Sequence, residues 1–355
     1  MSLYTTPLQF AYFFGWLFTL ILLCRGLRED KSSDLLLSLI IFTLTMEIQD
    51  YTLGFSGINF LWEKLNGFPR SFQLLLAPSV YLYIRSQSGS IQPLKKSDWM
   101  HFLPFLVYFV FHLIVFFSGT ELVRAYQKSD VSYWISHLEM AMVVASYIYY
   151  FYKSLSLLRV YNRWTKDQFS NQEKVSLSWL KTLIYLIVSA EILRFGFRVI
   201  DWFLDLPFNQ DWWWHLWTIC IIIYLSLKSY IKEDVSLPEI QKTEILPPSN
   251  DYSKWEKMIL QAFEAEKVYL DPNLSLTQLS QKLQSSPNTL SHVINHRFGK
   301  NFNDFVNEYR VREYLRISKN EGSEKFTKIA LAYDSGFNSK STFMRALKKY
   351  ESQAD

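Results

Sequence analysis

The chain has 355 residues, of which 49% are hydrophobic, 17% aromatic and 20% charged, and its formal net charge is +4. Its mean hydropathy of zero is the average of an apolar part and a soluble part, so the composition predicts two regions of different character. The two cysteines, Cys24 and Cys220, lie at or within apolar stretches. This placement excludes a disulfide framework or a cysteine metal site in the soluble part.

Seven apolar stretches follow one another in the first 231 residues, each near the roughly 20 residues that an α-helix needs to cross a bilayer. The third is the least regular, since it is short and contains Pro78. The first lacks the basic leading region and small-residue cleavage site of a signal peptide, so we expect it to remain as a membrane helix. The predicted spans are about 8–24, 35–53, 68–84, 99–117, 131–152, 177–204 and 212–230.

The distribution of Lys and Arg between the loops predicts the orientation, because cytoplasmic loops carry an excess of positive charge. With the amino terminus outside, the inner loops hold eleven Lys and Arg and the outer loops hold four. We therefore expect residues 232–355 to lie in the cytoplasm. The inner residues are Arg25, Arg28, Lys31, Arg85, Lys95, Lys96, Lys153, Arg159, Arg163, Lys166 and Lys174, and the outer ones are Lys64, Arg70, Arg124 and Lys128.

Charged side chains inside the spans are costly in a bilayer and are therefore candidates for function. On the predicted orientation they fall between mid-membrane and the outer end of each span, which favours a cavity open to the outside. Arg194 and Arg198 would anchor an anionic ligand, or pair with Glu139 or Glu47 in its absence. The alternative is structural pairing of Glu191 with Arg194 and of Arg198 with Asp201, each pair three residues apart on one helix. The candidate signal residues are Glu47, Asp50, Glu139, Glu191, Arg194 and Arg198.

Residues 232–251 are predicted to form an acidic linker that contains Pro238, Pro247 and Pro248. Proline-rich chain extends about 3 Å per residue, so this linker reaches at most on the order of 60 Å from the bilayer. The following helix, at 255–268, would serve either domain packing or a dimer contact. The sequence thus predicts a membrane domain at 1–231, a linker at 232–251 and a soluble helical domain at 252–355.

A first helix–turn–helix pair is predicted at 276–299. Leu276, Leu279 and Leu283 form one apolar stripe, and the turn at 284–286 is followed by Pro287 at the first position of the next helix. That second helix ends at Gly299. Its inward residues are Leu290, Val293, Ile294 and Phe298, and its outward residues are Asn288, Ser291, His292 and Asn295.

A second pair is predicted at 329–350, and a long amphipathic helix at 302–317 would fix the spacing of the two pairs. Ile329, Ala330 and Tyr333 recur at helical spacing, and Gly336 can take the left-handed conformation that ends a helix. Asn338 or Ser339 can cap the helix that follows.

The last helix of the second pair is expected to pack inward through Phe337, Phe343 and Leu347. Its opposite face is polar and basic, which suits the major groove of DNA, and two such helices about one DNA turn apart can enter successive major-groove faces. Residues 270–355 carry 13 Lys and Arg against 9 Asp and Glu, enough to attract phosphates without indiscriminate binding. The outward residues are Lys340, Ser341, Met344, Arg345 and Lys348.

Residues 274–350 resemble the DNA-binding domain of the AraC/XylS family of bacterial transcription regulators. The matching pieces are 276–283, 286–299, 305–316, 329–337 and 341–349. The resemblance implies two tandem helix–turn–helix motifs that read double-stranded DNA. The family's base contacts fall on Asn288, Ser291, His292, Lys340, Ser341, Met344 and Arg345.

The chain departs from the family pattern at a few positions. Ser280 stands where the family usually has alanine, and Leu347 stands where phenylalanine is common. The family normally continues past the lysines with a Gly-x-Thr-Pro-x-x-Tyr-Arg segment, whereas the sequence here ends at Asp355. We therefore expect a DNA-binding domain without its usual closing helix.

Nearly the whole chain resembles one architecture of the Bacteroidetes lineage, a seven-span membrane part fused to an AraC-type domain. The membrane part matches at 77–86, 101–105, 169–170 and 177–180. This resemblance implies a membrane-bound regulator in the bacterial inner membrane, with a periplasmic amino terminus, a cytoplasmic DNA-binding domain, an unknown small-molecule or protein signal and a possible homodimer.

The sequence leaves one alternative open, a membrane transporter or receptor whose helix–turn–helix tail is a degenerate protein-interaction module. Motifs for catalysis do not favour an enzyme, because the chain has no phosphate-cradling glycine loop, His-Glu-x-x-His motif or nucleophile elbow. We therefore expect no catalytic residue, no cofactor and no metal.

Overall fold

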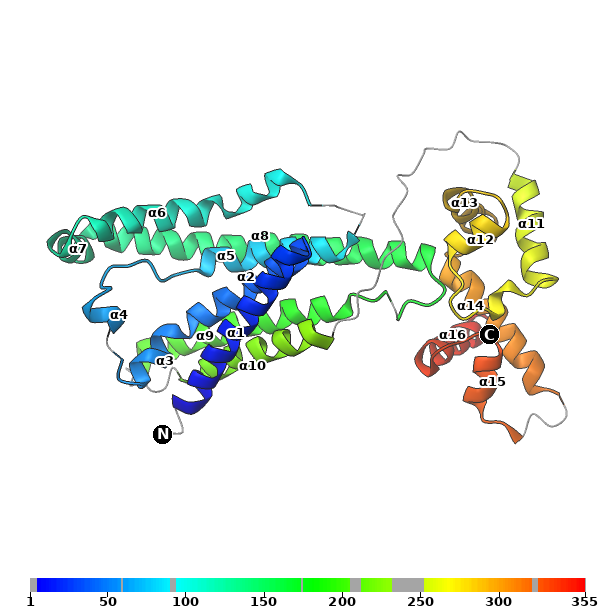
Figure 1. Ribbon diagram of the computed structural model, residues 1–355. Coiled ribbons are helices and arrows are strands. Elements are labelled where there is room, and N and C mark those ends of the chain that lie inside the picture. Colours follow the sequence, from blue (N-terminus) through cyan, green and yellow to red (C-terminus); the bar gives the residue numbers. More distant parts are fainter. Residues whose placement is uncertain are drawn as a thin grey trace. The chain divides into compact units, whose positions relative to one another are not determined.

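The computed structural model describes residues 5–58, 60–89, 94–173, 175–204, 212–231, 252–320 and 325–354, and the regular elements in these ranges are all helices (Figure 1). The predicted all-α class is therefore confirmed. The predicted linker at 232–251 lies outside the described residues. The chain forms two compact units, residues 1–158 with 177–234, and residues 159–176 with 235–355.

The N-terminal unit contains all seven predicted apolar stretches, and all of them are helical over most of their length, although the third begins in the irregular segment before Gln73. The second stretch covers two helices, α2 and α3, and the fifth begins a helix of 39 residues, α8. The elements are α1 (Thr5–Arg28), α2 (Ser32–Glu47), α3 (Gln49–Phe55), α4 (Phe60–Glu63), α5 (Gln73–Gln87), η2 (Lys96–Phe102), α6 (Leu103–Phe117), α7 (Thr120–Gln127), α8 (Asp130–Gln168), α9 (Ser178–Leu204) and α10 (Trp212–Ile231).

The core of this unit is formed by α1, α2, α5, α9 and α10, which pack against one another through aliphatic side chains such as Ile40, Ile41 and Ile222. Arg25 and Asp34 close the α1–α2 connection with two hydrogen bonds of 2.5 and 2.9 Å. Pro78 lies inside α5, where Ala77 and Val80 beside it are fully buried.

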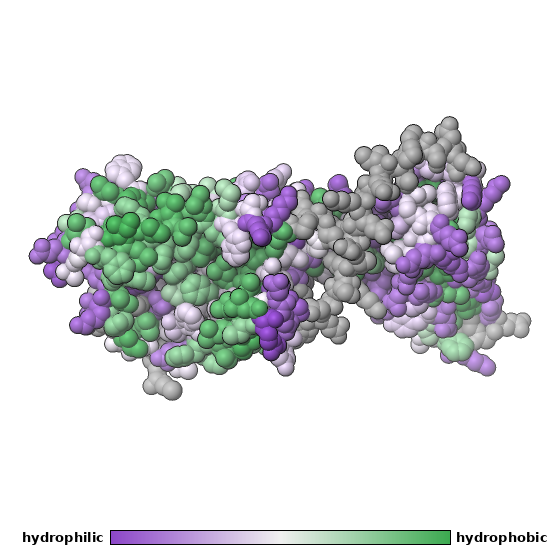
Figure 2. Space-filling model, turned by 45° about the horizontal axis from the view of Figure 1, so that its top comes forward, coloured by the Kyte–Doolittle hydropathy of each residue, from purple (hydrophilic) through white to green (hydrophobic). Residues whose placement is uncertain are grey.

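The outer surface of the N-terminal unit is strongly apolar, as Figure 2 shows over much of the face it displays. Two described helices, Thr6–Arg28 and Lys96–Phe117, are long and apolar enough to cross a bilayer by length and composition. Only 6% of the second window is buried within the protein, unlike the core helix of a water-soluble domain. The other predicted spans form helices that are shorter or richer in Trp, Tyr and charge.

The C-terminal unit contains two pairs of helices joined by tight turns, as the sequence predicts, with α14 between the pairs. α12 and α13 are the first pair, and α15 and α16 are the second (Figure 1). The elements are α11 (Tyr252–Glu264), η4 (Val268–Leu270), α12 (Leu276–Lys282), α13 (Pro287–Phe298), α14 (Phe302–Ser318), α15 (Lys328–Asp334) and α16 (Lys340–Ala354).

Side-chain caps define where these helices begin. The Ser286 hydroxyl accepts the Thr289 amide at 3.1 Å ahead of Pro287, as predicted. Of the two predicted caps for α16, Ser339 is the one that accepts the Thr342 amide, at 3.2 Å. Each cap satisfies a backbone N–H that the first turn of a helix leaves without a partner.

Each helix pair has its own small core. Leu290, Val293 and Ile294 of α13 are fully buried against α11, α12 and α14, as predicted. Phe337 and Phe343 are buried in the second core, but the inward face predicted for α15 is wrong at Tyr333, which is 49% exposed. Leu331 and Ala332 are buried in its place, because the helix is rotated relative to the Ile329–Tyr333 stripe.

The turn of the second pair depends on Gly336, which has the predicted left-handed conformation with φ of +91°. A Cβ at this position would lie 2.5 Å from the Tyr269 carbonyl oxygen and 2.9 Å from the Leu270 Cα. Gly299, which ends α13 at φ +64°, has no atom within 4 Å of such a Cβ. The two glycines therefore share a backbone conformation but differ in packing.

Gly336→Ala is expected to destabilise the α15–α16 pair by more than Gly299→Ala destabilises α13. Both substitutions force alanine into the left-handed region, at about 1 to 2 kcal/mol, but only Gly336→Ala also displaces backbone. Hydrogen exchange in the detergent-solubilised chain measures the loss of protection in the α15–α16 peptides of Gly336→Ala and in the α13 peptides of Gly299→Ala. An equal loss of protection in the two variants would show that the backbone of Tyr269 and Leu270 leaves room for a Cβ at position 336.

Candidate nucleic-acid interface and buried polar cluster

The first predicted reading face, on α13, is accessible. His292 and Asn295 are exposed, and Asn288 and Ser291 are half-buried. The Asn295 amide donates to the Ser291 hydroxyl at 3.4 Å, so these two side chains support each other on the surface. None of the four is used by the core, which leaves their polar groups available to a ligand.

Two rings surround His292 on this face. The ring centroids of His292 and His296 are 4.0 Å apart, and that of Tyr252, at the start of α11, is 5.0 Å from His292. Tyr252 also packs against the first core. The contact that α11 makes with α13 therefore reaches the edge of the predicted reading face and orients His292.

The second predicted reading face, on α16, is also exposed. Thr342 and Phe343 point inward and are buried, while the five predicted contact residues remain open to solvent. The Arg345 guanidinium bends back along its own helix, with Nε donating to the Ser341 carbonyl at 3.3 Å. The exposed residues are Lys340, Ser341, Met344, Arg345 and Lys348.

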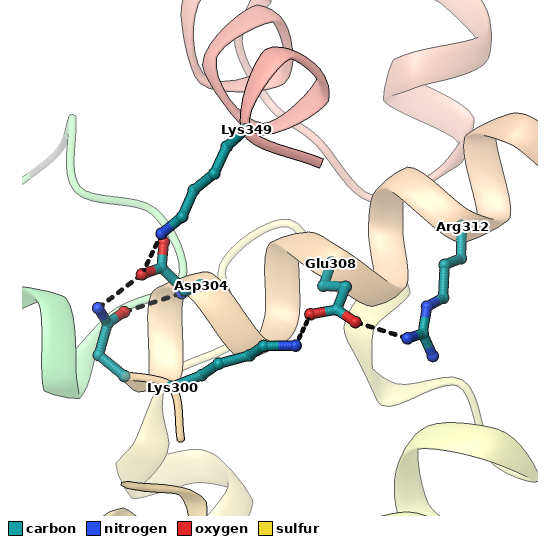
Figure 3. Close-up of polar contacts among 6 residues, drawn as sticks. Lys300, Asp304, Glu308, Arg312 and Lys349 are labelled. Atoms are coloured by element: carbon teal, nitrogen blue, oxygen red, sulfur yellow. Dashed lines mark hydrogen bonds and ion pairs between the residues drawn. The ribbon is translucent and has the colours of Figure 1, made fainter. Parts of the chain in front are cut away.

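Two separate groups of ion pairs on α14 contact residues of both helix pairs (Figure 3). Lys349 of α16 donates to Asp304 at 2.7 Å, while Glu308 accepts from Lys300 and, at 2.5 Å, from Arg312. Lys300 follows α13 and Lys349 lies on α16, so the acidic residues of α14 bind basic residues beside or on both helices that are predicted to read DNA. Lys300, Asp304, Glu308 and Lys349 also line a groove of about 430 Å³. The helix predicted to link the two pairs therefore makes ion pairs to both of them.

Three features of the C-terminal unit were not predicted from the sequence. Arg310 of α14 is 1% exposed and hydrogen-bonds to the backbone at Tyr269 and Asp271, at 2.7 Å each. Glu313 accepts hydrogen bonds from Arg316 and Lys267, and these bonds hold its pKa at about 2. Residues 169–173, expected in a membrane-domain loop, pack within this unit.

Arg194 is the centre of a charged cluster in the N-terminal unit. Its Nη1 donates to Glu47 of α2 at 2.8 Å, and its Nη2 donates to Glu191 on its own helix. Tyr147 of α8 donates its hydroxyl to Glu191 at 3.0 Å. The three charged side chains are between 12% and 19% exposed. The predicted Glu191–Arg194 pair and the predicted Glu47–Arg194 pair therefore form together.

The other predicted signal residues have different partners. Glu139 accepts a hydrogen bond from Ser71 at 2.7 Å instead of pairing with Arg194, and Asp50 pairs with Arg70 at 3.0 Å. The side chain of Arg198, on α9, lies outside the described part of the chain. The structure thus brings Glu47, Glu191 and Arg194 together. Outside this cluster, Asp50 pairs with Arg70, and Glu139 accepts from the neutral Ser71.

Arg194 lies between two cavities that share the lining residues Ser71, Gln73 and Arg194. The larger, of about 900 Å³, is also lined by Glu139, Glu191 and Tyr147. The smaller, of about 510 Å³, is also lined by Glu47, Asp50 and Arg70. The walls of the larger cavity are mostly apolar with a few converging polar groups, which is typical of small-molecule sites, whereas the smaller cavity is lined mainly by polar groups.

Comparisons with known proteins give no match for this chain. No family model matches it, and neither a curated protein nor a solved structure is similar to it.

Arg194→Gln is expected to destabilise the N-terminal unit by about 3 to 5 kcal/mol, because it leaves the buried carboxylates of Glu47 and Glu191 without their cation. The triple variant Glu47→Gln, Glu191→Gln, Arg194→Gln removes all three charges and should recover much of that loss. Lys181→Gln, on the same helix but outside the cluster, serves as the matched control.

The measurement is the temperature at which half of the detergent-solubilised chain remains monodisperse by size-exclusion chromatography. An Arg194→Gln variant as stable as Lys181→Gln would show that the cluster does not hold α2, α8 and α9 together.

Proposed function

We propose that this chain is a membrane-bound, sequence-specific transcription regulator of the AraC/XylS type, with a seven-span membrane domain and a cytoplasmic DNA-binding domain. One observation carries the proposal most directly: two capped helices, α13 and α16, present exposed polar and basic faces and are held to a common linker helix, α14. This is the arrangement that reads successive stretches of the major groove.

The motif residues support the family assignment beyond their spacing. Ser280, at a position where the family usually has alanine, is 3% exposed, and its hydroxyl donates to the Thr277 carbonyl at 2.8 Å. The departure therefore leaves no unsatisfied polar atom in the core. Gly336 has both the conformation and the close backbone contact that require glycine.

The membrane assignment is supported by the apolar exterior of the N-terminal unit and by the arrangement of its charges. Described residues such as Phe117, Trp134 and Phe203 are 69% to 78% exposed, a cost that lipid would remove. The charges of Glu47, Glu191 and Arg194 face one another and not the exterior, as expected for polar groups inside a membrane domain.

The cavities beside Arg194 are the site where we propose that the signal binds. A ligand carrying an anionic group would compete with Glu47 and Glu191 for the guanidinium, and the strength of that competition would depend on how well the ligand replaces both carboxylates. The helices that carry the cluster, α2, α8 and α9, would then change their packing.

Arg345→Ala is expected to weaken binding of a selected DNA duplex by about ten- to 100-fold and to relax specificity at one base pair, because a bidentate Arg–guanine contact contributes about 1 to 3 kcal/mol of discrimination. The duplex is selected from a random pool by the full chain in detergent, and fluorescence anisotropy measures the affinity. Lys319→Ala removes the same charge from an exposed position at the end of α14.

If Arg345→Ala and Lys319→Ala lost the same affinity for the duplex, the change in net charge alone would explain the loss. That result would contradict base reading by α16. Recovery of no enriched sequence from the pool at low salt would contradict the proposed function as a whole, and would favour an interaction module at the end of a transporter or receptor.

The proposed topology predicts opposite behaviour for two fusions. Alkaline phosphatase needs disulfides that form only outside the cytoplasm, so it should be active when fused after Ser129, in a predicted outer loop, and inactive when fused after Asp355. Matched expression levels of the two fusions are the control. Phosphatase activity after Asp355 would place the C-terminal unit on the side without DNA and end the proposal.

A further inference from the structure

Residues 169–177 connect α8 to α9, and the described residues of this α8–α9 loop up to 176 belong to the C-terminal unit. Phe169 forms an antiparallel β-bridge with Ser275, and the Ser170 amide donates to the Leu274 carbonyl at 3.2 Å. The Ser170 hydroxyl donates to the same carbonyl at 2.6 Å. The loop therefore contacts the chain where the first helix pair begins.

Side chains of α14 extend this contact. The Asn303 amide donates to the carbonyls of Phe169 and Ser170 at 3.2 and 2.7 Å, and Arg310 donates to the Ser170 hydroxyl at 3.2 Å. Ser170 is fully buried. Undocking Ser170 would leave buried donors and acceptors without partners, which costs free energy. The end of the loop at Ser170 is therefore held more firmly than the end at Glu173.

The other end of the loop reaches α16. One carboxylate oxygen of Glu173 accepts hydrogen bonds from the hydroxyls of Ser339, at 2.7 Å, of Ser341, and of Thr342, at 3.4 Å. These hydrogen bonds lower the pKa of Glu173, which keeps it anionic at neutral pH. An anion is thus held by the three hydroxyls in the first turn of the predicted DNA-reading helix.

The same groups are those that a DNA phosphate would use. Phosphates in protein–DNA complexes accept hydrogen bonds from Ser and Thr hydroxyls and from the N-terminal turns of helices. Ser341 is in addition one of the predicted base-contacting residues. A duplex whose major groove received α16 would bring phosphate and base edges to the position that the Glu173 carboxylate occupies.

We propose that the α8–α9 loop is an autoinhibitory latch, in which Glu173 takes the place of DNA at the first turn of α16 and must leave before the second helix pair can read its site. This inference rests on the proposed DNA-binding function. Glu173 is solvent-exposed, so its release costs little compared with that of Ser170. The latch therefore opens at Glu173 while Ser170 stays docked.

The position of the latch in the chain connects it to the signal site. The loop is covalently continuous with α8, which carries Tyr147, and with α9, which carries Glu191 and Arg194. A ligand that separates Tyr147 from Glu191 changes the packing of the two helices at whose ends the loop is attached. The apparent DNA affinity then rises by the factor by which the unlatched fraction increases.

Glu173→Ala tests the latch, with Asp167→Ala as the matched control. Both variants remove one negative charge from the same segment, but Asp167, on α8, makes no described contact with α16. The full chain in detergent is titrated with a duplex selected from a random pool. We expect Glu173→Ala to bind about three- to tenfold more tightly than wild type, as suits the loss of exposed ionic hydrogen bonds, and Asp167→Ala to bind as wild type.

A covalent lock gives a second readout that does not depend on the charge. Glu173→Cys and Ser341→Cys are combined in a chain with Cys24→Ser and Cys220→Ser. The latch predicts that a short, reducible bis-methanethiosulfonate reagent, which spans the reach lost from Glu to Cys, joins the two sites in the absence of DNA. The cross-linked chain should bind DNA more weakly than the same double-cysteine variant without the cross-link, and reduction of the sample should remove this difference.

The possible failures are distinguishable. Equal affinity of wild type, Glu173→Ala and Asp167→Ala would overturn the latch while leaving the regulator function in place. So would a cross-linked double-cysteine variant that binds DNA as well as the same variant without the cross-link. Absence of the cross-link would show that the loop does not occupy α16 in solution and would overturn it as well. Loss of all DNA binding in wild type and in Glu173→Ala alike would overturn the proposed function, and the latch with it.

Discussion

The C-terminal unit depends on one buried cation, Arg310. Its guanidinium reaches the carbonyls of Tyr269 and Asp271, the hydroxyl of Ser170 and the face of Phe337, 5.9 Å away. A charge held at 1% exposure is stable only when its donors are matched by acceptors. Burial lowers the pKa of Arg310 to about 10, which leaves it charged at neutral pH. The first core, the second core and the α8–α9 loop are thus organised around the same side chain.

Local pattern was sufficient to predict the helices and their exposed faces. The caps at Ser286 and Ser339, the left-handed Gly336 and the apolar spacing of Leu290, Val293 and Ile294 are all determined by residues within one or two turns. Where the pattern was short, as on α15, the stripe of Ile329, Ala330 and Tyr333 did not give the buried face, and Tyr333 is exposed. Seven residues give too few turns to fix the rotation of a helix.

The sequence predicted contacts between distant segments only for charged side chains, which need a partner of opposite charge inside an apolar unit. Glu47 and Arg194 are 147 residues apart, yet a carboxylate and a guanidinium inside an apolar unit have few alternative partners. The sequence gives no such signal for Ser170 or Glu173, because a serine and a glutamate in a polar loop can hydrogen-bond to water. Their contacts with Leu274 and Ser339 span 104 and 166 residues and follow from the tertiary fold alone.

Because Ser170 packs within the C-terminal unit, the complete folding unit includes residues from the α8–α9 loop as well as the chain after 252. A boundary at 252 divides the chain where the apolar pattern suggests, but a fragment cut there would lose the β-bridge to Ser275 and one acceptor of Arg310. Proteolysis before 252 would leave the loop on the N-terminal fragment, held to the severed domain by non-covalent bonds alone. Cleavage of the chain and separation of the two fragments would then be two separate events.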